Sequence, residues 1–174
     1  MALAIRLDSP GPVFFRQVRV GRGGALFRIH KFRSMQVDAP AQGPKVTVGR
    51  DPRITRMGHW LRHYRVDELP QFIDVLFGQM SLVGPRPEVP HFVAHYPPAI
   101  AAQVLAVRPG ITDPASLAHL DEAALLAAAS DPEREYIDHI LPRKLALQAE
   151  YARTATLRSD LAVLARTLGV LLSR

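Results

Sequence analysis

The sequence predicts a mostly helical α+β fold with a small β-hairpin near its N-terminus. Residues 12–20 are rich in Val and Phe, and a glycine-rich turn separates them from a second run at residues 25–32, a pattern typical of a hairpin. After them, capping residues alternate with apolar residues at helical spacing. The chain contains no internal repeat or low-complexity linker, so we expect one domain over residues 1–174.

Charge and composition narrow the possible partners. Lys and Arg outnumber Asp and Glu by 22 to 16, which favours an anionic partner such as nucleic acid, anionic lipid or a phosphorylated metabolite. No cysteine is present, which excludes disulfides, thiolate metal sites and thiol nucleophiles. The longest apolar stretches fall short of the ~20 residues that a membrane-spanning helix needs.

Few helix signals occur in the first third of the sequence, before Thr55. Residues 1–7 are too short for a signal peptide, and their apolar pattern is that of the end of a longer helix. The turn at residues 21–24 lacks the lysine, the serine and the following helix of a phosphate-binding loop, so we interpret it as a hairpin turn. Residues 38–49 are polar and rich in Pro and Gly, which predicts a mobile surface loop.

Helix signals begin at Thr55, which can cap a short helix through Tyr64. Asp67 can cap a second helix, which Gly78 ends. Apolar residues recur along this second helix at helical spacing: Leu69, Phe72, Ile73, Leu76 and Phe77. Further helices are expected over residues 98–107 and 120–129, and three more after the capping pairs Asp131-Pro132, Leu141-Pro142 and Ser159-Asp160.

Two adjacent carboxylates, Asp67 and Glu68, are the first candidates for chemistry. One interpretation makes Asp67 an N-cap and Glu68 a first-turn acid, because acids are enriched there. The other is a site for phosphate and a cation, for which the chain offers basic residues: Lys31, Arg33, Arg53, Arg56, Arg62 and Arg86. Mg²⁺ suits such a site, because carboxylates and phosphates supply its oxygen ligands. The scattered histidines form no zinc pattern.

Arg86 lies in a segment that is expected to be rigid. Glycine and two prolines surround it in Gly84-Pro85-Arg86-Pro87, which fixes the backbone and gives the guanidinium a defined direction. A rigid arginine suits phosphate recognition, although a simple turn with a solvated arginine gives the same pattern.

The chain resembles the bacterial sugar transferases of the monotopic phosphoglycosyl transferase superfamily. Six motifs in order carry the resemblance: Ser9-Pro10-Gly11-Pro12-Val13-Phe14-Phe15-Arg16-Gln17, Lys31-Phe32-Arg33-Ser34-Met35, Asp51-Pro52-Arg53-Ile54-Thr55-Arg56 with Leu61-Arg62, Asp67-Glu68-Leu69-Pro70-Gln71, Met80-Ser81-Leu82-Val83-Gly84-Pro85-Arg86-Pro87-Glu88, and Val107-Arg108-Pro109-Gly110-Ile111-Thr112. They cover about the first two-thirds of the chain. The resemblance implies the catalytic domain of such an enzyme.

The resemblance assigns Asp67 and Glu68 to catalysis. Asp67 is implied to be the nucleophile that attacks the β-phosphate of a UDP-sugar, releases UMP and passes the sugar phosphate to polyprenyl (undecaprenyl) phosphate. Asp67 is also implied to contact Mg²⁺, and Glu68 either handles a proton or orients Asp67. Lys31, Arg62 and Arg86 are assigned to substrate binding, and Arg33, in the same motif as Lys31, is a further candidate for substrate binding.

Two departures from the family concern the membrane and the sugar. Relatives begin with a re-entrant helix on the cytoplasmic face of the inner membrane, of which residues 1–7 resemble the last turns. Either the start is missing, or the membrane surface is contacted by amphipathic segments such as residues 159–174, and without any anchor the chain would be soluble. We expect the leucine stripe of residues 159–174 to pack in the core or in a homodimer. The second departure, Asp113-Pro114-Ala115-Ser116 after Thr112, indicates a subfamily.

Two other functions are compatible with the same composition. A basic module could bind nucleic acid through the arginines of the hairpin, but aromatic residues interleave poorly with them and no recognition-helix or RNA-binding signature occurs, so we expect no nucleic-acid partner. Alternatively, the chain is an inactive fragment or a partner subunit with the same fold.

Overall fold

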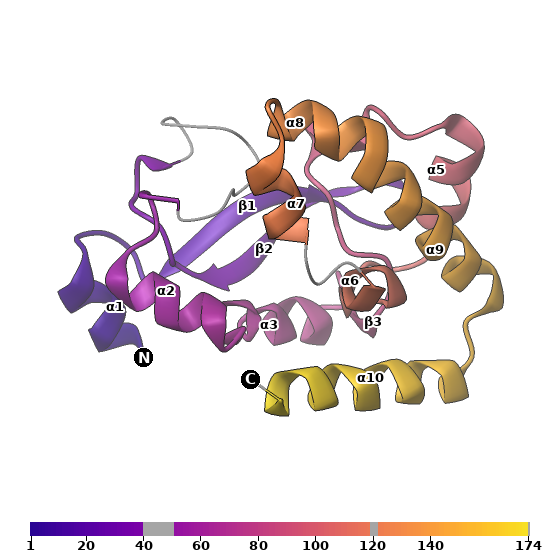
Figure 1. Cartoon of the computed structure of the whole chain (residues 1–174). Coiled ribbons are helices and arrows are strands. Elements are labelled where there is room, and N and C mark those ends of the chain that lie inside the picture. Colours follow the sequence, from indigo (N-terminus) through magenta and orange to yellow (C-terminus); the bar gives the residue numbers. More distant parts are fainter. Residues whose placement is uncertain (40–50, 119–121, 174) are drawn as a thin grey trace.

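The computed structural model describes residues 1–39, 51–118 and 122–173 (Figure 1). The elements run in this order: α1 (Ala2–Asp8), β1 (Phe14–Val20), η1 (Arg22–Gly24), β2 (Leu26–Phe32), α2 (Arg56–His63), η3 (Val66–Glu68), α3 (Gln71–Leu76), β3 (Ser81–Val83), α4 (Pro90–Val93), α5 (Pro98–Val104), β4 (Gly110–Thr112), α6 (Pro114–Ala118), α7 (Glu122–Ala128), α8 (Pro132–Glu135), η4 (Tyr136–Ile140), α9 (Leu141–Thr154) and α10 (Leu157–Leu172). The predicted α+β class, mostly helical with a small N-terminal sheet, is confirmed. Most of the expected loop at residues 38–49 lies outside the described residues.

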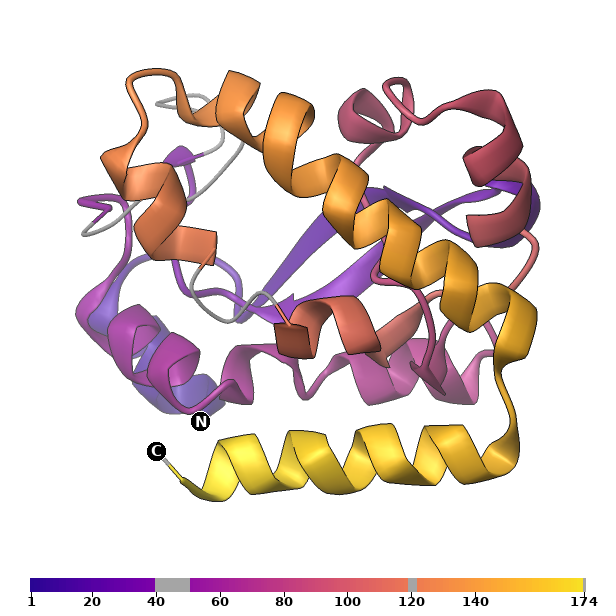
Figure 2. The same ribbon diagram turned by 45° about the vertical axis from the view of Figure 1, so that its right-hand side comes forward.

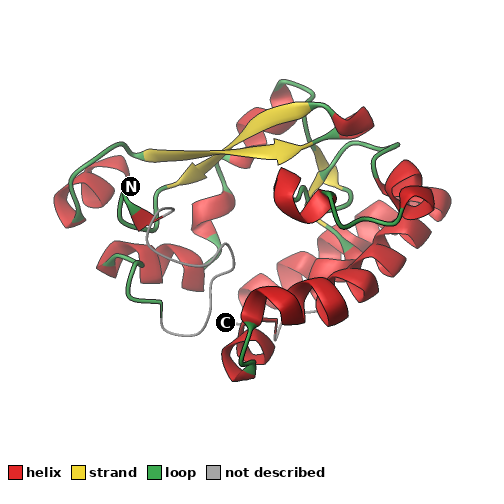
Figure 3. Ribbon diagram, turned by 90° about the horizontal axis from the view of Figure 1, so that it is seen from above, coloured by secondary structure: helices red, strands yellow, loops and turns green. Residues whose placement is uncertain are grey.

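The hairpin is a long, twisted antiparallel pair. Strands β1 and β2 pair from Phe14 opposite Phe32 to Val20 opposite Leu26. Gly23 and Gly24 in the turn have φ of +67° and +81°, a left-handed conformation that glycine adopts at low cost. Seen from above (Figure 3), the hairpin runs along one side of the molecule and the C-terminal helices occupy the other.

A second, shorter sheet pairs β3 with β4 in parallel, with Ser81 opposite Gly110 and Val83 opposite Thr112. The backbones approach so closely that a Cβ atom on Gly110 would lie 2.1 Å from the Gly84 nitrogen. Because parallel strands end at the same edge, the segments that follow β3 and β4 lie beside each other.

Several helix boundaries are set by local capping residues. The Thr55 hydroxyl accepts a hydrogen bond from the Gly58 N–H at 3.0 Å, as expected for the cap of α2. The cap of α10 lies three residues before the expected Ser159, because Thr156 is the N-cap and forms a capping box with Ser159. Helix α9 begins at Leu141 with Pro142 in its first turn, as expected, but it continues the π turn η4 without a break in the chain's helical course.

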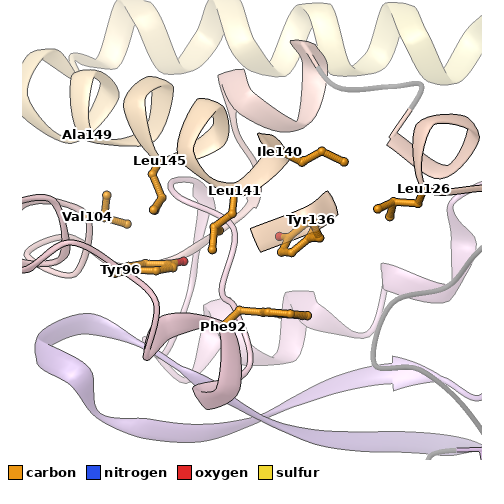
Figure 4. Close-up of a cluster of buried hydrophobic side chains, with 9 residues drawn as sticks. All are labelled: Phe92, Tyr96, Val104, Leu126, Tyr136, Ile140, Leu141, Leu145 and Ala149. Atoms are coloured by element: carbon orange, nitrogen blue, oxygen red, sulfur yellow. The ribbon is translucent and has the colours of Figure 1, made fainter. Parts of the chain in front are cut away.

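The main core lies between the hairpin side and α9 (Figure 4). Its buried members are Phe92, Tyr96, Val104, Leu126, Tyr136, Ile140, Leu141, Leu145 and Ala149. A smaller cluster of Phe27, Ile29 and Met80 joins the hairpin to β3. These two clusters fix the hairpin, α9 and β3 around the segments that carry the candidate site.

Helices α1, α2, α3 and α10 gather along the lower side of the molecule in Figures 1 and 2, which are related by a rotation about the vertical axis. In α3 the apolar stripe faces outward: Leu69, Phe72 and Leu76 are exposed, whereas Gln71 and Asp74 are buried.

The leucine stripe of α10 is also exposed, at Leu161, Leu168 and Leu172, so the expectation that it packs in the core is wrong. This helix packs instead through a neighbouring face, on which Val163 is buried and the Thr167 hydroxyl bonds Thr112. Within the described residues, no helix combines the length and the hydropathy needed to cross a bilayer.

Candidate active site

Asp67 lies in a short 3-10 turn between α2 and α3. The turn follows Arg65, which has a left-handed φ of +57°, an uncommon conformation for a non-glycine residue. Asp67 does not cap a helix, because α3 begins only after Pro70 and has no side-chain cap. Proline favours a helix start, since it has no N–H to leave unpaired there. The N-cap interpretation is therefore wrong, and the Asp67 carboxylate is not occupied by a cap.

Glu68 is held by two cations from distant parts of the chain. Lys31 on β2 donates to Oε1 at 2.7 Å. Arg86 donates to both carboxylate oxygens, to Oε2 at 3.1 Å and also to Oε1. Burial alone would raise the pKa of Glu68, but the charges and hydrogen bonds of Arg86 and Lys31 bring it well below its usual value of 4.5. Glu68 therefore stays ionised and its hydrogen-bonding capacity is used.

Asp67 is buried, with 8% of its surface exposed, yet no donor among the described residues forms a hydrogen bond to its carboxylate. Burial, and then the charge of Glu68, raise the pKa of Asp67 above its usual 3.8. The charges of Lys31, Arg62 and Arg86 oppose that rise. Asp67 is thus a buried carboxylate that receives no hydrogen bond from the described part of the chain and lies within electrostatic reach of three cations.

Arg62 lies on the last turn of α2, on the other side of the 3-10 turn from α3. Its Nε donates to the Ser34 hydroxyl at 2.9 Å. Burial lowers the pKa of Arg62, and the charge of Asp67 is the largest of the effects that oppose the shift. The structure therefore brings Lys31, Arg62 and Arg86 to the carboxylate pair, as the sequence predicts.

Arg33 does not join them. Its side chain is 3% exposed and donates to the carbonyls of Pro12 at 2.6 Å and Ser9 at 2.8 Å, and to the Ser9 hydroxyl. Arg33 lies just past the end of β2, and its bonds to Ser9 and Pro12 direct the guanidinium toward the segment between α1 and β1. The expectation that Arg33 binds substrate is replaced by a structural role, which fixes the segment between α1 and β1.

Sequence reasoning missed the groups that hold the Arg86 loop. The Arg86 N–H donates to Asp113 Oδ2 at 3.2 Å, and Arg19 donates to the carbonyl of Pro87 at 2.9 Å. Asp113 was visible only as a departure from the family pattern. The arginines of the hairpin were seen only as a source of positive charge.

The residues present can hold Mg²⁺ only with help from a substrate. Among the residues that the structure describes, no group of three or more His, Asp or Glu side chains could hold a metal ion by itself. Within residues 1–39, 51–118 and 122–173, no donor bonds the carboxylate of Asp67, whereas that of Glu68 is bound by Lys31 and Arg86. One protein carboxylate plus substrate phosphates is an ordinary arrangement for Mg²⁺.

Comparison with known proteins identifies relatives of the chain. It is 45% identical over 140 residues to a UDP-N-acetylgalactosamine-undecaprenyl-phosphate N-acetylgalactosaminephosphotransferase of Aeromonas hydrophila, which covers 79% of this chain and 32% of the relative. It is 40% identical over 177 residues to a UDP-glucose:undecaprenyl-phosphate glucose-1-phosphate transferase of Caulobacter vibrioides, which covers 99% of this chain and 61% of the relative. The chain thus spans about a third to three fifths of the lengths of these two proteins.

The sequence model of one protein family, described as bacterial sugar transferase, matches residues 1–174. The match covers every element described above, including the 3-10 turn that carries Asp67 and Glu68. The chain therefore belongs to the bacterial sugar transferase family.

Proposed function

We propose that this protein transfers a sugar 1-phosphate from a UDP-sugar to polyprenyl phosphate, most simply undecaprenyl phosphate, through a covalent intermediate on Asp67. One observation carries the proposal: the buried carboxylate of Asp67 receives no hydrogen bond from any described residue and lies within electrostatic reach of Lys31, Arg62 and Arg86. The chain's membership of the bacterial sugar transferase family and the names of its relatives support a UDP-sugar and a polyprenyl phosphate as the substrate classes. Those names include both N-acetylgalactosamine and glucose, so the sugar is to be found by assay.

In the first step an oxygen of Asp67 attacks the β-phosphorus of the UDP-sugar. The bond from that phosphorus to the bridging oxygen breaks, and UMP leaves with the electron pair. The sugar phosphate stays on Asp67 as an acyl phosphate. Both reactants are anions, so the neighbouring cations must lower their repulsion before they meet, which is the role that we assign to Lys31, Arg62 and Arg86.

In the second step a phosphate oxygen of polyprenyl phosphate attacks the same phosphorus and displaces the Asp67 carboxylate. The product is a polyprenyl diphosphate sugar, and Asp67 returns to its starting state. Neither step requires a proton to be moved, because each nucleophile and each leaving group is an oxyanion. Glu68, which is ionised and bonded to Lys31 and Arg86, would therefore hold these two cations in place and would not carry a proton.

Mg²⁺ is the cofactor that we propose, with Asp67 and the substrate phosphates as its ligands. When bound, it would supply further positive charge at the pyrophosphate. The side chains of Lys31 and Arg86 would meet the same phosphates from the hairpin and from the loop after β3.

The membrane surface is the second proposed partner, since polyprenyl phosphate resides there. Large apolar side chains are exposed along α1, α2, α3 and α10, the helices of the lower side: Leu3, Leu7, Trp60, Tyr64, Leu69, Phe72, Leu76, Phe77, Leu157, Leu161, Leu168, Leu171 and Leu172. We call them the apolar face. Basic residues on the same helices, Arg6, Arg56, Arg158 and Arg166, suit anionic lipid headgroups. Helix α3 follows the 3-10 turn directly, so docking would bring Asp67 to the lipid headgroups.

This placement suits the cytoplasmic face of the bacterial inner membrane, where the protein would be peripheral or monotopic. A homodimer through the apolar face stays a prediction, and light scattering with and without lipid nanodiscs separates it from lipid docking.

The experiment that tests the proposed function is turnover. The protein, in nanodiscs with undecaprenyl phosphate and Mg²⁺, is incubated with UDP-glucose, UDP-galactose and their N-acetylamino counterparts, and UMP is measured. UMP release and a polyprenyl diphosphate sugar with at least one donor are expected. UMP release without a lipid product would contradict transfer, and no release from any donor would contradict the reaction class.

A further inference from the structure

The loop that carries Arg86 is fixed by the short parallel sheet. The Gly84 N–H donates to the Thr112 carbonyl at 3.0 Å, and the Gly110 N–H donates to the Pro85 carbonyl at 3.0 Å. A Cβ atom on Gly84 would lie 2.4 Å from the Arg108 carbonyl oxygen, so the two segments are in close contact. The residue that follows β4, Asp113, is therefore brought beside the residues that follow β3.

Asp113 is fully buried, and three donors converge on its carboxylate. Oδ2 accepts from the Arg86 N–H at 3.2 Å and from Gln148 Nε2 at 2.7 Å. Oδ1 accepts from the Ser116 N–H at 2.7 Å. Gln148 lies on α9 and is itself 2% exposed. A buried carboxylate is tolerated where hydrogen bonds replace its water, and here they come from three separate elements.

Arg86 is thus held at both ends. Asp113 fixes its backbone, and Glu68, next to the proposed nucleophile, receives its guanidinium. We propose that Asp113 is a positioning residue, kept in place by Gln148, that aims Arg86 at Glu68 and at the substrate phosphate. The inference rests on the proposed function and adds to it a path by which helix α9 controls the geometry of the catalytic turn.

The substitution Asp113→Asn perturbs this arrangement with little change in shape. All three partners of Asp113 are donors, so an amide must turn its own NH₂ group toward at least one of them. Gln148→Leu is the milder variant, because it removes one of those donors and leaves the bond between Asp113 and Arg86. It also keeps the test available if Asp113→Asn folds poorly.

The test is a double-mutant cycle with Arg86→Ala, measured as kcat and KM for sugar-phosphate transfer and as melting temperature. In the otherwise unchanged protein, Asp113→Asn should lower kcat by roughly tenfold to a hundredfold, because a small misplacement of a charged group has such effects. In the Arg86→Ala background the same substitution should change kcat by less than about threefold. The loss of melting temperature should be similar in both backgrounds.

The control is Tyr151→Phe on the same helix α9, which removes the 2.8 Å hydrogen bond from that hydroxyl to Asp160 and leaves the bonds of Asp113 to Arg86 and Gln148 in place. It should lower the melting temperature and leave kcat unchanged. Equal fold-losses of kcat for Asp113→Asn in both backgrounds would overturn the inference, since a purely structural residue acts regardless of Arg86.

If the unchanged protein transfers no sugar phosphate, the proposed function fails by itself. The same cycle is then run on UMP binding by calorimetry. Coupling of the two substitutions would support the positioning of Arg86 by Asp113, and additivity would overturn it.

Discussion

The exposed end of α3 should contribute directly to membrane binding. Leu76 and Phe77 are 86% and 75% exposed, although they follow the 3-10 turn of the carboxylate pair. Full burial of a Leu or Phe side chain is worth about 1.5–3 kcal/mol, so removing both from lipid contact should cost about 3 kcal/mol of binding free energy. Since 1.4 kcal/mol corresponds to a tenfold change, Leu76→Ser with Phe77→Ser should weaken partitioning on the order of a hundredfold.

Sedimentation with vesicles of anionic and zwitterionic lipid measures that partitioning. The control is Leu26→Ser, which replaces a leucine that is 65% exposed at the start of β2, away from the lower helices. It should bind vesicles like the unchanged protein. All variants should keep their melting temperature, because exposed side chains contribute little to folding. Unchanged partitioning of the α3 variant, or equal loss in the control, would refute the docking of the apolar face.

Three further predictions concern charge and stability. Glu68→Gln should lower the free energy of unfolding, measured by urea denaturation, by roughly 3 kcal/mol, because it leaves Lys31 and Arg86 without their buried counter-charge. A loss below about 0.5 kcal/mol would contradict that pairing. Because the pKa of Glu68 is lowered in the folded state, the contribution of its charge to stability is complete above pH 4.5 and is lost as the pH falls further. The difference in melting temperature between the unchanged protein and Glu68→Gln should therefore become smaller in acid. A difference that stays constant with pH would count against this role of Glu68. Arg33→Met should cost about 2–4 kcal/mol of stability with KM unchanged, whereas a raised KM with normal stability would restore Arg33 to the substrate site.

Local signals in the sequence predicted the parts of the fold that depend on near neighbours. The hairpin and the cap at Thr55 follow from glycine, β-branched and hydroxyl residues within a few positions. The π turn before Pro142 could not be predicted, because Pro after Leu141 equally signals a new helix. Periodicity identified the apolar stripe of α3 but not the side that it faces, since a 3.6-residue repeat is the same for core and for surface.

In the candidate site, too, some residues could be predicted from the sequence and others depend on contacts between distant segments. Lys31, Arg62 and Arg86 were expected at the carboxylate pair, and the structure places them there through β2, α2 and the loop after β3. Arg33, two residues from Lys31, was assigned by proximity in sequence, but it lies past the end of β2, and its hydrogen bonds to the carbonyls of Ser9 and Pro12 decide its direction. The support from Asp113 depends on the pairing of β3 with β4, which no local pattern encodes.

Intact mass of the protein after reaction tests the covalent role of Asp67 most directly. The protein is mixed with Mg²⁺ and an accepted UDP-sugar in the absence of polyprenyl phosphate, and its mass is compared with that of Asp67→Asn. A sugar-phosphate adduct is expected on the unchanged protein, with UMP in equal amount, and it should disappear when polyprenyl phosphate is added. An adduct of the same mass on Asp67→Asn would contradict Asp67 as the nucleophile.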